Sequence, residues 1–129
     1  MHLIVVMMLG ERLFQGVWQL NDYESDSRDG TLRIDNRDFR ADGVHGRYVG
    51  YVSIRSDTSP AQIDFTIEDC ECKFEGMTST EIYYEDDGTI VLAGPAPGDP
   101  RPKAFTRLKE MWRLRPLDPA TEGDASAQR

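Results

Sequence analysis

The fold class of this chain is set by the stretch Gln-Ile-Asp-Phe-Thr-Ile-Glu at residues 62–68. Polar and apolar residues alternate at every position, so one face of the segment suits a core and the other suits water. This period of two predicts an antiparallel β-strand that is buried on one side.

The same alternation recurs in shorter segments along the chain. Further strands are expected at residues 17–23, 31–35, 47–55, 70–75, 80–84, 89–93, 103–108 and 111–115. Turn sequences between the runs are Asp29-Gly30, Asp42-Gly43, Ser59-Pro60 and Asp87-Gly88. About nine short strands with short connections are typical of an all-β sandwich or an up-and-down barrel. Helical spacing of apolar residues occurs only around residues 4–9, which predicts a short N-terminal helix.

Length and charge exclude several classes of function. The 129 residues include 15 Lys and Arg against 23 Asp and Glu, a formal charge of −8. A single domain of this length buries a core without the help of disulfides or a metal. The acidic balance argues against nucleic-acid partners and against anionic membranes, because both are bound through basic surfaces. We expect residues 1–115 to form the domain and residues 116–129, with one large apolar side chain, to form a disordered tail.

Charge is also distributed unevenly along the chain. Residues 64–88 hold nine acids and one base, whereas residues 101–115 hold six bases and one acid. Two interpretations remain open. Either the two segments compensate each other across neighbouring strands, or the acidic segment forms a surface for a cation or a basic partner.

Cys70 and Cys72 are separated by a single residue. Side chains two apart in a strand are poorly placed for a disulfide, so both are expected to be free, buried thiols. The two histidines, His2 and His45, lie far from them in the sequence, and we expect no metal and no cofactor.

The apolar run at residues 3–9 is too short for a membrane helix and lacks the features of a signal peptide. The expected location is cytoplasmic.

Four short motifs occur in order along the chain. They are Gly16-Val17-Trp18, Pro60-Ala61-Gln62-Ile63-Asp64, Ile82-Tyr83 followed by Asp87-Gly88, and Arg101-Pro102-Lys103-Ala104-Phe105. In this order they resemble a planctomycete-type lipocalin-like domain family of uncharacterised proteins. The resemblance implies an antiparallel up-and-down β-barrel of about eight to ten strands, and it implies no particular biochemical activity. The family pattern has Gly before Ile-Tyr, where this chain has Glu81.

The first motif also has a physical interpretation. Gly16 allows a bulge or a close backbone approach where the first strand begins. Trp18 can close one end of a barrel. In lipocalins an arginine near the last strand stacks on this tryptophan, which makes Arg113 or Arg115 its expected partner here.

No catalytic arrangement is recognisable in the sequence. His45 lies in a glycine-flanked turn without an orienting partner, and the serines lie outside any nucleophile motif. We therefore expect a non-enzymatic domain that binds a small apolar or amphipathic ligand in the barrel. The expected lining residues are Tyr48, Val52, Ile54, Ile63, Phe65, Phe74, Ile82, Leu92 and Phe105. The alternative is a protein–protein interaction module with a filled barrel, which uses the proline-rich loop at residues 94–102 or the acidic face.

Overall fold

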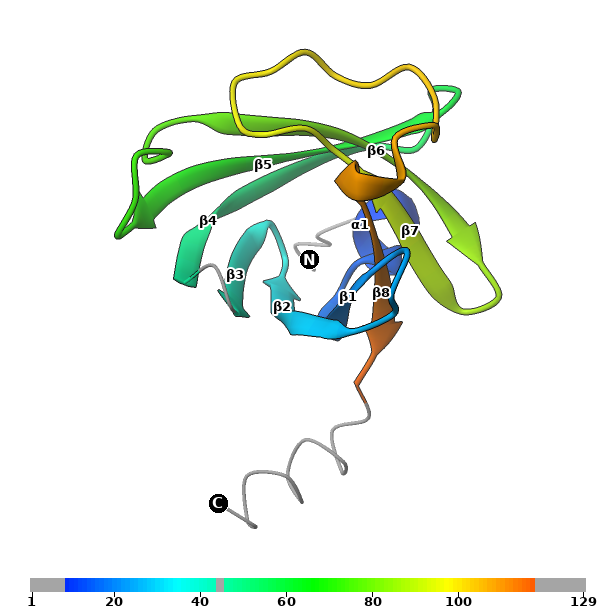
Figure 1. Cartoon of the computed structure of the whole chain (residues 1–129), viewed down its shortest axis with the longest axis horizontal. Helices are drawn as coiled ribbons and strands as arrows, with labels where there is room; N and C mark the ends of the chain where they lie inside the picture. Colours follow the sequence, from blue (N-terminus) through cyan, green and yellow to red (C-terminus); the bar gives the residue numbers. More distant parts are fainter. Residues whose placement is uncertain (1–8, 44–45, 118–129) are drawn as a thin grey trace, which may run out of the picture.

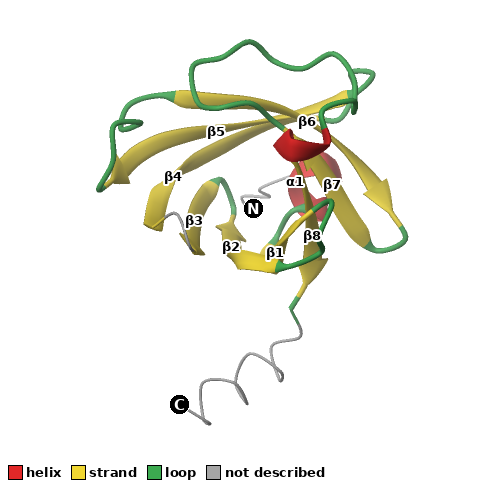
Figure 2. Cartoon of the chain, viewed as in Figure 1, coloured by secondary structure: helices red, strands yellow, loops and turns green. Residues whose placement is uncertain are grey.

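The computed structural model describes residues 9–43 and 46–117. Over these residues the chain forms a closed antiparallel barrel in which each strand pairs with the next and β8 pairs with β1 (Figure 1). The eight strands are β1 (Gly16–Asp22), β2 (Arg28–Asp35), β3 (Asp38–Gly43), β4 (Gly46–Arg55), β5 (Ala61–Cys70), β6 (Thr78–Asp86), β7 (Thr89–Ala93) and β8 (Met111–Pro116). A short helix, α1 (Leu9–Leu13), precedes β1, and a 3-10 turn, η1 (Leu108–Glu110), precedes β8 (Figure 2). The predicted up-and-down barrel with a short N-terminal helix is confirmed.

The predicted strands correspond to every strand of the barrel except β3. β3 was missed because its sequence, Asp-Phe-Arg-Ala-Asp-Gly, offers only Phe39 and Ala41 as apolar residues. Two predictions are wrong: residues 71–76 form a turn, and residues 103–107 are irregular. These segments alternate in composition but have no strand to pair with, because β5 pairs directly with β6 and β7 directly with β8.

The turn predictions divide into two groups. Asp87 and Gly88 both have positive φ and join β6 to β7 in the predicted hairpin, and Ser59-Pro60 lies in the connection from β4 to β5. Asp29-Gly30 is instead part of β2, and Asp42-Gly43 is the last pair of residues of β3. Gly30 pairs there with Gly43, and a side chain at Gly30 would collide with the backbone of β3. This glycine permits the close approach of two strands.

One end of the barrel is closed by the segment around α1. Phe14 is fully buried and packs edge-on against Tyr83, with ring centroids 4.8 Å apart. Trp18 is buried as predicted, and its indole N–H donates a hydrogen bond to the Phe14 carbonyl oxygen (2.8 Å). Ile34, which pairs with Gly16 at the start of β1, and Ile90, which pairs with Glu85 near the hairpin from β6 to β7, are also buried. We call this part of the molecule the closed end.

The expected stacking of an arginine on Trp18 is wrong. Trp18 faces the interior, whereas Arg113 and Arg115 occupy outward positions of β8, because side chains alternate along a strand. Arg113 donates a hydrogen bond to Asp86 (2.9 Å), and Arg115 donates one to Asp26 (3.1 Å). The arginines therefore stabilise the outer surface and do not contact the barrel plug.

Gly16 has a different role from the one expected. Its φ is 113°, in a region that side chains rarely adopt, and a Cβ atom there would meet open space. Gly16 therefore allows the chain to pass from α1 into β1, and it makes no close backbone approach.

A second apolar cluster lies on the outer surface of β6, β7 and β8. Its members are Ile82, Val91, Ala93 and Met111, with Tyr23 and Phe105 packed against them. The long connection from β7 to β8 runs over this side of the barrel, coloured yellow to orange in Figure 1. The predicted irregular loop at residues 94–102 is part of this connection. Gly98 attaches it to β6 by donating its N–H to the Thr78 carbonyl oxygen (3.0 Å).

The two oppositely charged segments meet on the outer surface. Arg101 pairs with Asp64 (2.7 Å) and Arg113 with Asp86 (2.9 Å), as the cross-strand interpretation expects.

Several predictions fall on residues outside the described ranges. These are the apolar run before α1, the predicted tail beyond residue 117, and the two histidines, His2 and His45.

Candidate functional site

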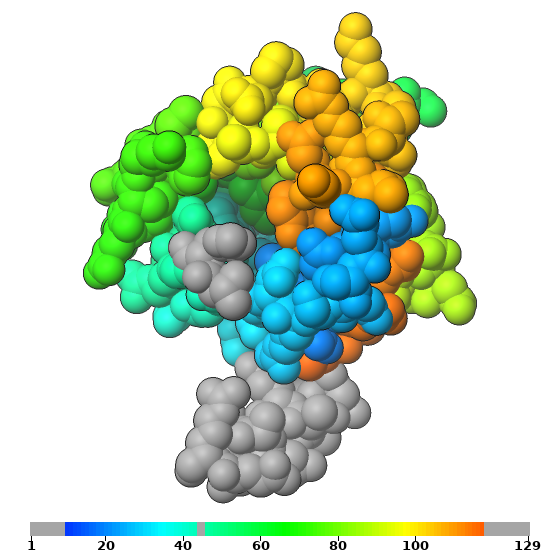
Figure 3. Space-filling view, in the orientation of Figure 1, coloured from blue at the N-terminus to red at the C-terminus, as the bar shows by residue number. Residues whose placement is uncertain are grey.

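The end of the barrel opposite the closed end contains a cavity of about 490 Å³, which we call the open-end cavity. Figure 3 shows a hollow on this face, with the yellow segment that follows β7 along its rim. Its wall combines inward residues of the barrel with residues of the turn after β5 and the loop after β7. The described lining residues are Leu20, Leu32, Phe39, Ala41, Tyr48, Phe65, Ile67, Phe74, Ser79, Glu81, Leu92, Gly94, Pro95, Ala96, Pro97, Glu110 and Trp112.

The predicted lining residues separate into three groups. Those that line the open-end cavity are Tyr48, Phe65, Phe74 and Leu92. Those that belong to the packed interior instead are Val52, Ile54 and Ile63. The predictions for Ile82 and Phe105 are wrong, because both residues belong to the apolar cluster on the outside of the barrel.

The error at Ile82 concerns the face of β6. Ile82 and Tyr83 are adjacent apolar residues, so the sequence does not decide which of them points inward. The register pairs Glu81 with the interior residue Ile63, which places Ser79, Glu81 and Tyr83 on the inner face. Glu81 was missed because it occupies a position where alternation predicts an apolar side chain.

Glu81 is a buried acid in the wall of the cavity. The residue is 8% exposed, and Ser79 Oγ donates a hydrogen bond to Glu81 Oε2 (2.9 Å). Among the described residues, none donates a hydrogen bond to Glu81 Oε1. A Cβ atom at Gly94 would collide with the Glu81 side chain. The glycine therefore leaves the space in which the carboxyl group lies.

Burial raises the pKa of Glu81 from 4.5 to about 7, because desolvation penalises the charged carboxylate. The hydrogen bond from Ser79 opposes this rise in pKa, the negative charge of Asp64 adds to it, and the positive charge of Arg101 opposes it. Arg101 forms its ion pair with Asp64 and donates a hydrogen bond to the Glu81 carbonyl oxygen (2.8 Å). Since the pKa is about 7, the Glu81 carboxyl group changes between its protonated and its ionised form near neutral pH.

Aromatic side chains form much of the remaining wall. Phe39 and Phe65 meet edge-on, with ring centroids 5.2 Å apart. Tyr48 and Trp112 line the same cavity, and Phe74 reaches it from the turn after β5. Aromatic rings bury a large apolar area and present negatively polarised faces. This wall can therefore contact either an apolar group or a positively charged one.

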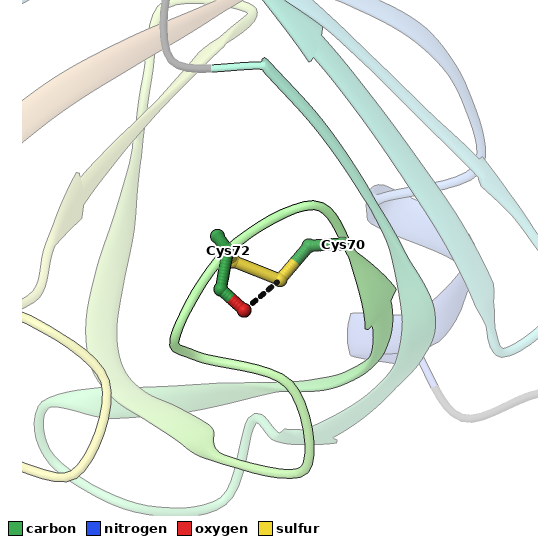
Figure 4. Close-up of a disulfide and its surroundings, with 2 residues drawn as sticks. All are labelled: Cys70 and Cys72. Carbon is green, nitrogen blue, oxygen red and sulfur yellow. Dashed lines mark hydrogen bonds between the residues drawn. A yellow bond between two sulfur atoms is a disulfide. The ribbon is translucent and has the colours of Figure 1, made fainter.

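Cys70 and Cys72 form a disulfide in the turn that carries Phe74 (Figure 4). Their Cα atoms are 5.2 Å apart, whereas two residues of strand span about 6.6 Å. The predicted pair of free thiols is wrong, because that prediction assumed a strand where the chain bends after β5. Free thiols would favour a reducing compartment, so the disulfide takes this support away from the expected cytoplasmic location.

Comparisons with family models, with curated proteins and with solved structures found no match to this chain. In residues 9–43 and 46–117, no group of three or more His, Cys, Asp or Glu side chains is placed to hold a metal ion. No helix within these same ranges has both the length and the apolar character to cross a membrane. The open-end cavity combines a mostly apolar wall with a buried acid, Glu81.

Proposed function

We propose that this protein binds a small apolar or amphipathic ligand in the open end of its barrel, in the manner of a lipocalin-like domain. The observation that carries the proposal is the open-end cavity, with a volume of about 490 Å³ and a mostly apolar and aromatic wall. Ligand pockets in proteins are typically about 300–1,000 Å³, with an apolar wall and a few polar groups that orient the ligand. Ser79 and Glu81 supply such polar groups here.

The contrast between the two ends also supports this proposal. An eight-stranded barrel has room for its own side chains or for one small ligand. At the closed end, Phe14 and Trp18 fill the interior with large, buried side chains. At the open end, the inward positions include the smaller Ala41, Ser79 and Gly94. The interaction-module alternative requires a barrel that is filled along its whole length.

We assign the polar pair in the cavity to ligand positioning and propose a non-enzymatic role. Nucleophilic catalysis requires a nucleophile, a base and a group that orients the base. Ser79 and Glu81 provide a hydroxyl and a carboxylate at 2.9 Å. The described part of the chain supplies no side-chain donor to the second carboxylate oxygen, so the third member of such an arrangement is missing there.

A fluorescence titration with the neutral apolar probe N-phenyl-1-naphthylamine tests the proposal. The full chain should increase the emission of the probe in a saturable way. The variant Ala41→Trp places a large ring in the cavity and should abolish this binding. The same substitution at Ala104, an exposed residue outside the open-end cavity, is the matched control and should leave binding unchanged.

Native mass spectrometry of the gently purified protein and a thermal-shift screen of fatty acids, retinoids and haem can then identify ligand candidates. A ligand at about 100 times its Kd should stabilise the fold by about 2.7 kcal/mol. Two results would overturn the proposal: no saturable binding of the probe, or equal binding by the parent and Ala41→Trp. Either result would favour the interaction module.

A further inference from the structure

The charged groups of the open-end cavity are of one sign. Among its described lining residues, the only ionisable carboxyl groups are those of Glu81 and Glu110, and none of these residues is Lys, Arg or His. Glu110 pairs with the exposed Arg107 over 3.6 Å, whereas Glu81 is buried in the wall. A ligand carboxylate would therefore meet like charge, and a ligand cation would meet opposite charge.

The two oxygen atoms of the Glu81 carboxyl group differ. Oε2 accepts a hydrogen bond from Ser79, and Oε1 has no donor among the described residues. Arg101, the basic residue with the clearest influence on Glu81, donates to its backbone carbonyl oxygen and pairs with Asp64. The cavity wall thus presents, on a residue that is itself buried, a carboxyl oxygen that can accept a hydrogen bond from a ligand.

The aromatic wall points to the same ligand chemistry. The aromatic residues that line the cavity are Phe39, Tyr48, Phe65, Phe74 and Trp112. Ammonium groups are attracted to the faces of such rings when they lie within about 6 Å of the centroid. Phe74 already has this interaction within the chain, because Lys73 Nζ lies 5.4 Å from its ring centroid. Aromatic faces beside a buried acid are a favourable environment for an organic cation.

We propose that the open-end cavity selects organic cations: ligands with an apolar body and an amine or ammonium group that lies against Glu81. This inference rests on the proposed function, since it names the chemical class of the ligand in the same cavity. A protonated amine donates a charge-assisted hydrogen bond to Glu81 Oε1, and its apolar body contacts the aromatic wall. Ligands with a carboxylate in the same place are disfavoured.

Competition against the neutral probe separates this inference from the proposed function. Octylamine, octan-1-ol and octanoate have apolar chains of equal length and differ in charge. We expect octylamine to displace the probe at the lowest concentration and octanoate at the highest. If the probe binds but octanoate competes as well as octylamine or better, the cation selectivity is overturned while the ligand-binding barrel stands. If the probe does not bind, the proposed function itself fails.

The variant Glu81→Gln tests the role of the carboxylate with little change of shape. We expect it to weaken octylamine binding roughly tenfold or more, because a charge-assisted hydrogen bond is lost, and to leave octan-1-ol nearly unaffected. Glu68→Gln removes the same charge from an exposed position outside the cavity, so octylamine binding should stay as in the parent. Retention of the octylamine preference in Glu81→Gln would overturn the inference.

The pH dependence provides a second readout. The groups that influence Glu81 are Ser79 on its own strand, Asp64 on β5 and Arg101 in the loop after β7, and Glu110 lines the same cavity. Octylamine stays protonated across neutral pH, so its binding should tighten from about pH 6 to about pH 8 as Glu81 ionises. Glu81→Gln should show no such change. Binding that weakens over this range would contradict a carboxylate contact.

Discussion

The closed and open ends of the barrel are built from the same eight strands but have opposite interiors. At the closed end, Phe14 and Trp18 are both buried, Phe14 packs against Tyr83, and the Phe14 carbonyl oxygen accepts a hydrogen bond from the Trp18 indole N–H. At the open end, Ser79 and Glu81 occupy inward positions beside a cavity of about 490 Å³. The difference shows that one strand can contribute both to a packed core and to the wall of a cavity.

β6 illustrates this division within a single strand. Its inward residues run from Ser79 through Glu81 to Tyr83, from the cavity to the core at the closed end. Burying a carboxyl group costs free energy unless it is neutral or paired. Large buried side chains at the closed end, such as Phe14 and Trp18, can offset this cost, because apolar burial stabilises the fold. We therefore expect the closed end to dominate stability and the open end to dominate binding.

The largest expected effect is at the closed end. Trp18→Ala should lower the free energy of unfolding by about 3–5 kcal/mol, because it removes a buried ring and leaves the Phe14 carbonyl oxygen without its donor. Phe74→Ala, a truncation of a partly buried ring at the open end, should cost much less. Urea denaturation of both variants measures the difference. Equal losses would contradict the division of the barrel into a stabilising end and a binding end.

The next effect concerns pH and Glu81. Its carboxyl group holds a proton more tightly in the folded chain than in the unfolded chain, because its pKa rises from 4.5 to about 7 on burial. The stabilisation that comes from this tighter proton binding by Glu81 is therefore fully present below about pH 4.5. It is lost as the pH rises through about 7. At about 1.4 kcal/mol for each pKa unit, the loss amounts to about 3 kcal/mol.

Glu81→Gln isolates this effect because glutamine does not titrate. We compare the free energy of unfolding of the variant with that of the parent at each pH. The difference between them should shift in favour of the variant as the pH rises from about 4.5 to above 7, because only the parent loses stability over this range. Glu68→Gln, at an exposed position, should follow the pH profile of the parent. Denaturant titrations across this pH range measure all three proteins. Parallel profiles for the parent and Glu81→Gln would mean that the carboxyl group is not desolvated, and the open end would then be wetter than described.

The sequence predicts the barrel well because most strands show their inner face by alternation. Residues 62–68 correspond to the central part of β5, and Ile63, Phe65 and Ile67 all face the core. Trp18 was also predicted to be buried, since a large ring at the start of the first strand can close a barrel. Its partner was not predicted, because the hydrogen bond to a carbonyl oxygen depends on the path of α1.

The candidate site was harder to predict because its buried acid breaks the alternation of polar and apolar residues. Glu81 is polar at an inward position, and the neighbouring Ile82 is apolar at an outward one. Ile82 is buried in an outer cluster against which Phe105, from the connection between β7 and β8, packs. The Cys70–Cys72 disulfide was not predicted, because the alternating composition of these residues suggested a strand. That composition gives no sign of the bend after β5 that brings the two cysteines together. The error at Ile82 depends on a tertiary contact and the error at the cysteines on a local bend, and the alternation of polar and apolar residues contains neither.

The central claim is that ligands enter the open end and leave the closed end undisturbed. Methyl NMR spectra recorded during titration with N-phenyl-1-naphthylamine test it most directly, because the aromatic rings of the probe shift nearby methyl signals. We expect the signals of Leu32 and Leu92, which line the cavity, to move, and those of Ile34 and Ile90, in the packed interior, to stay in place. Shifts confined to the outer residue Ile82, or equal shifts at both ends, would contradict the account.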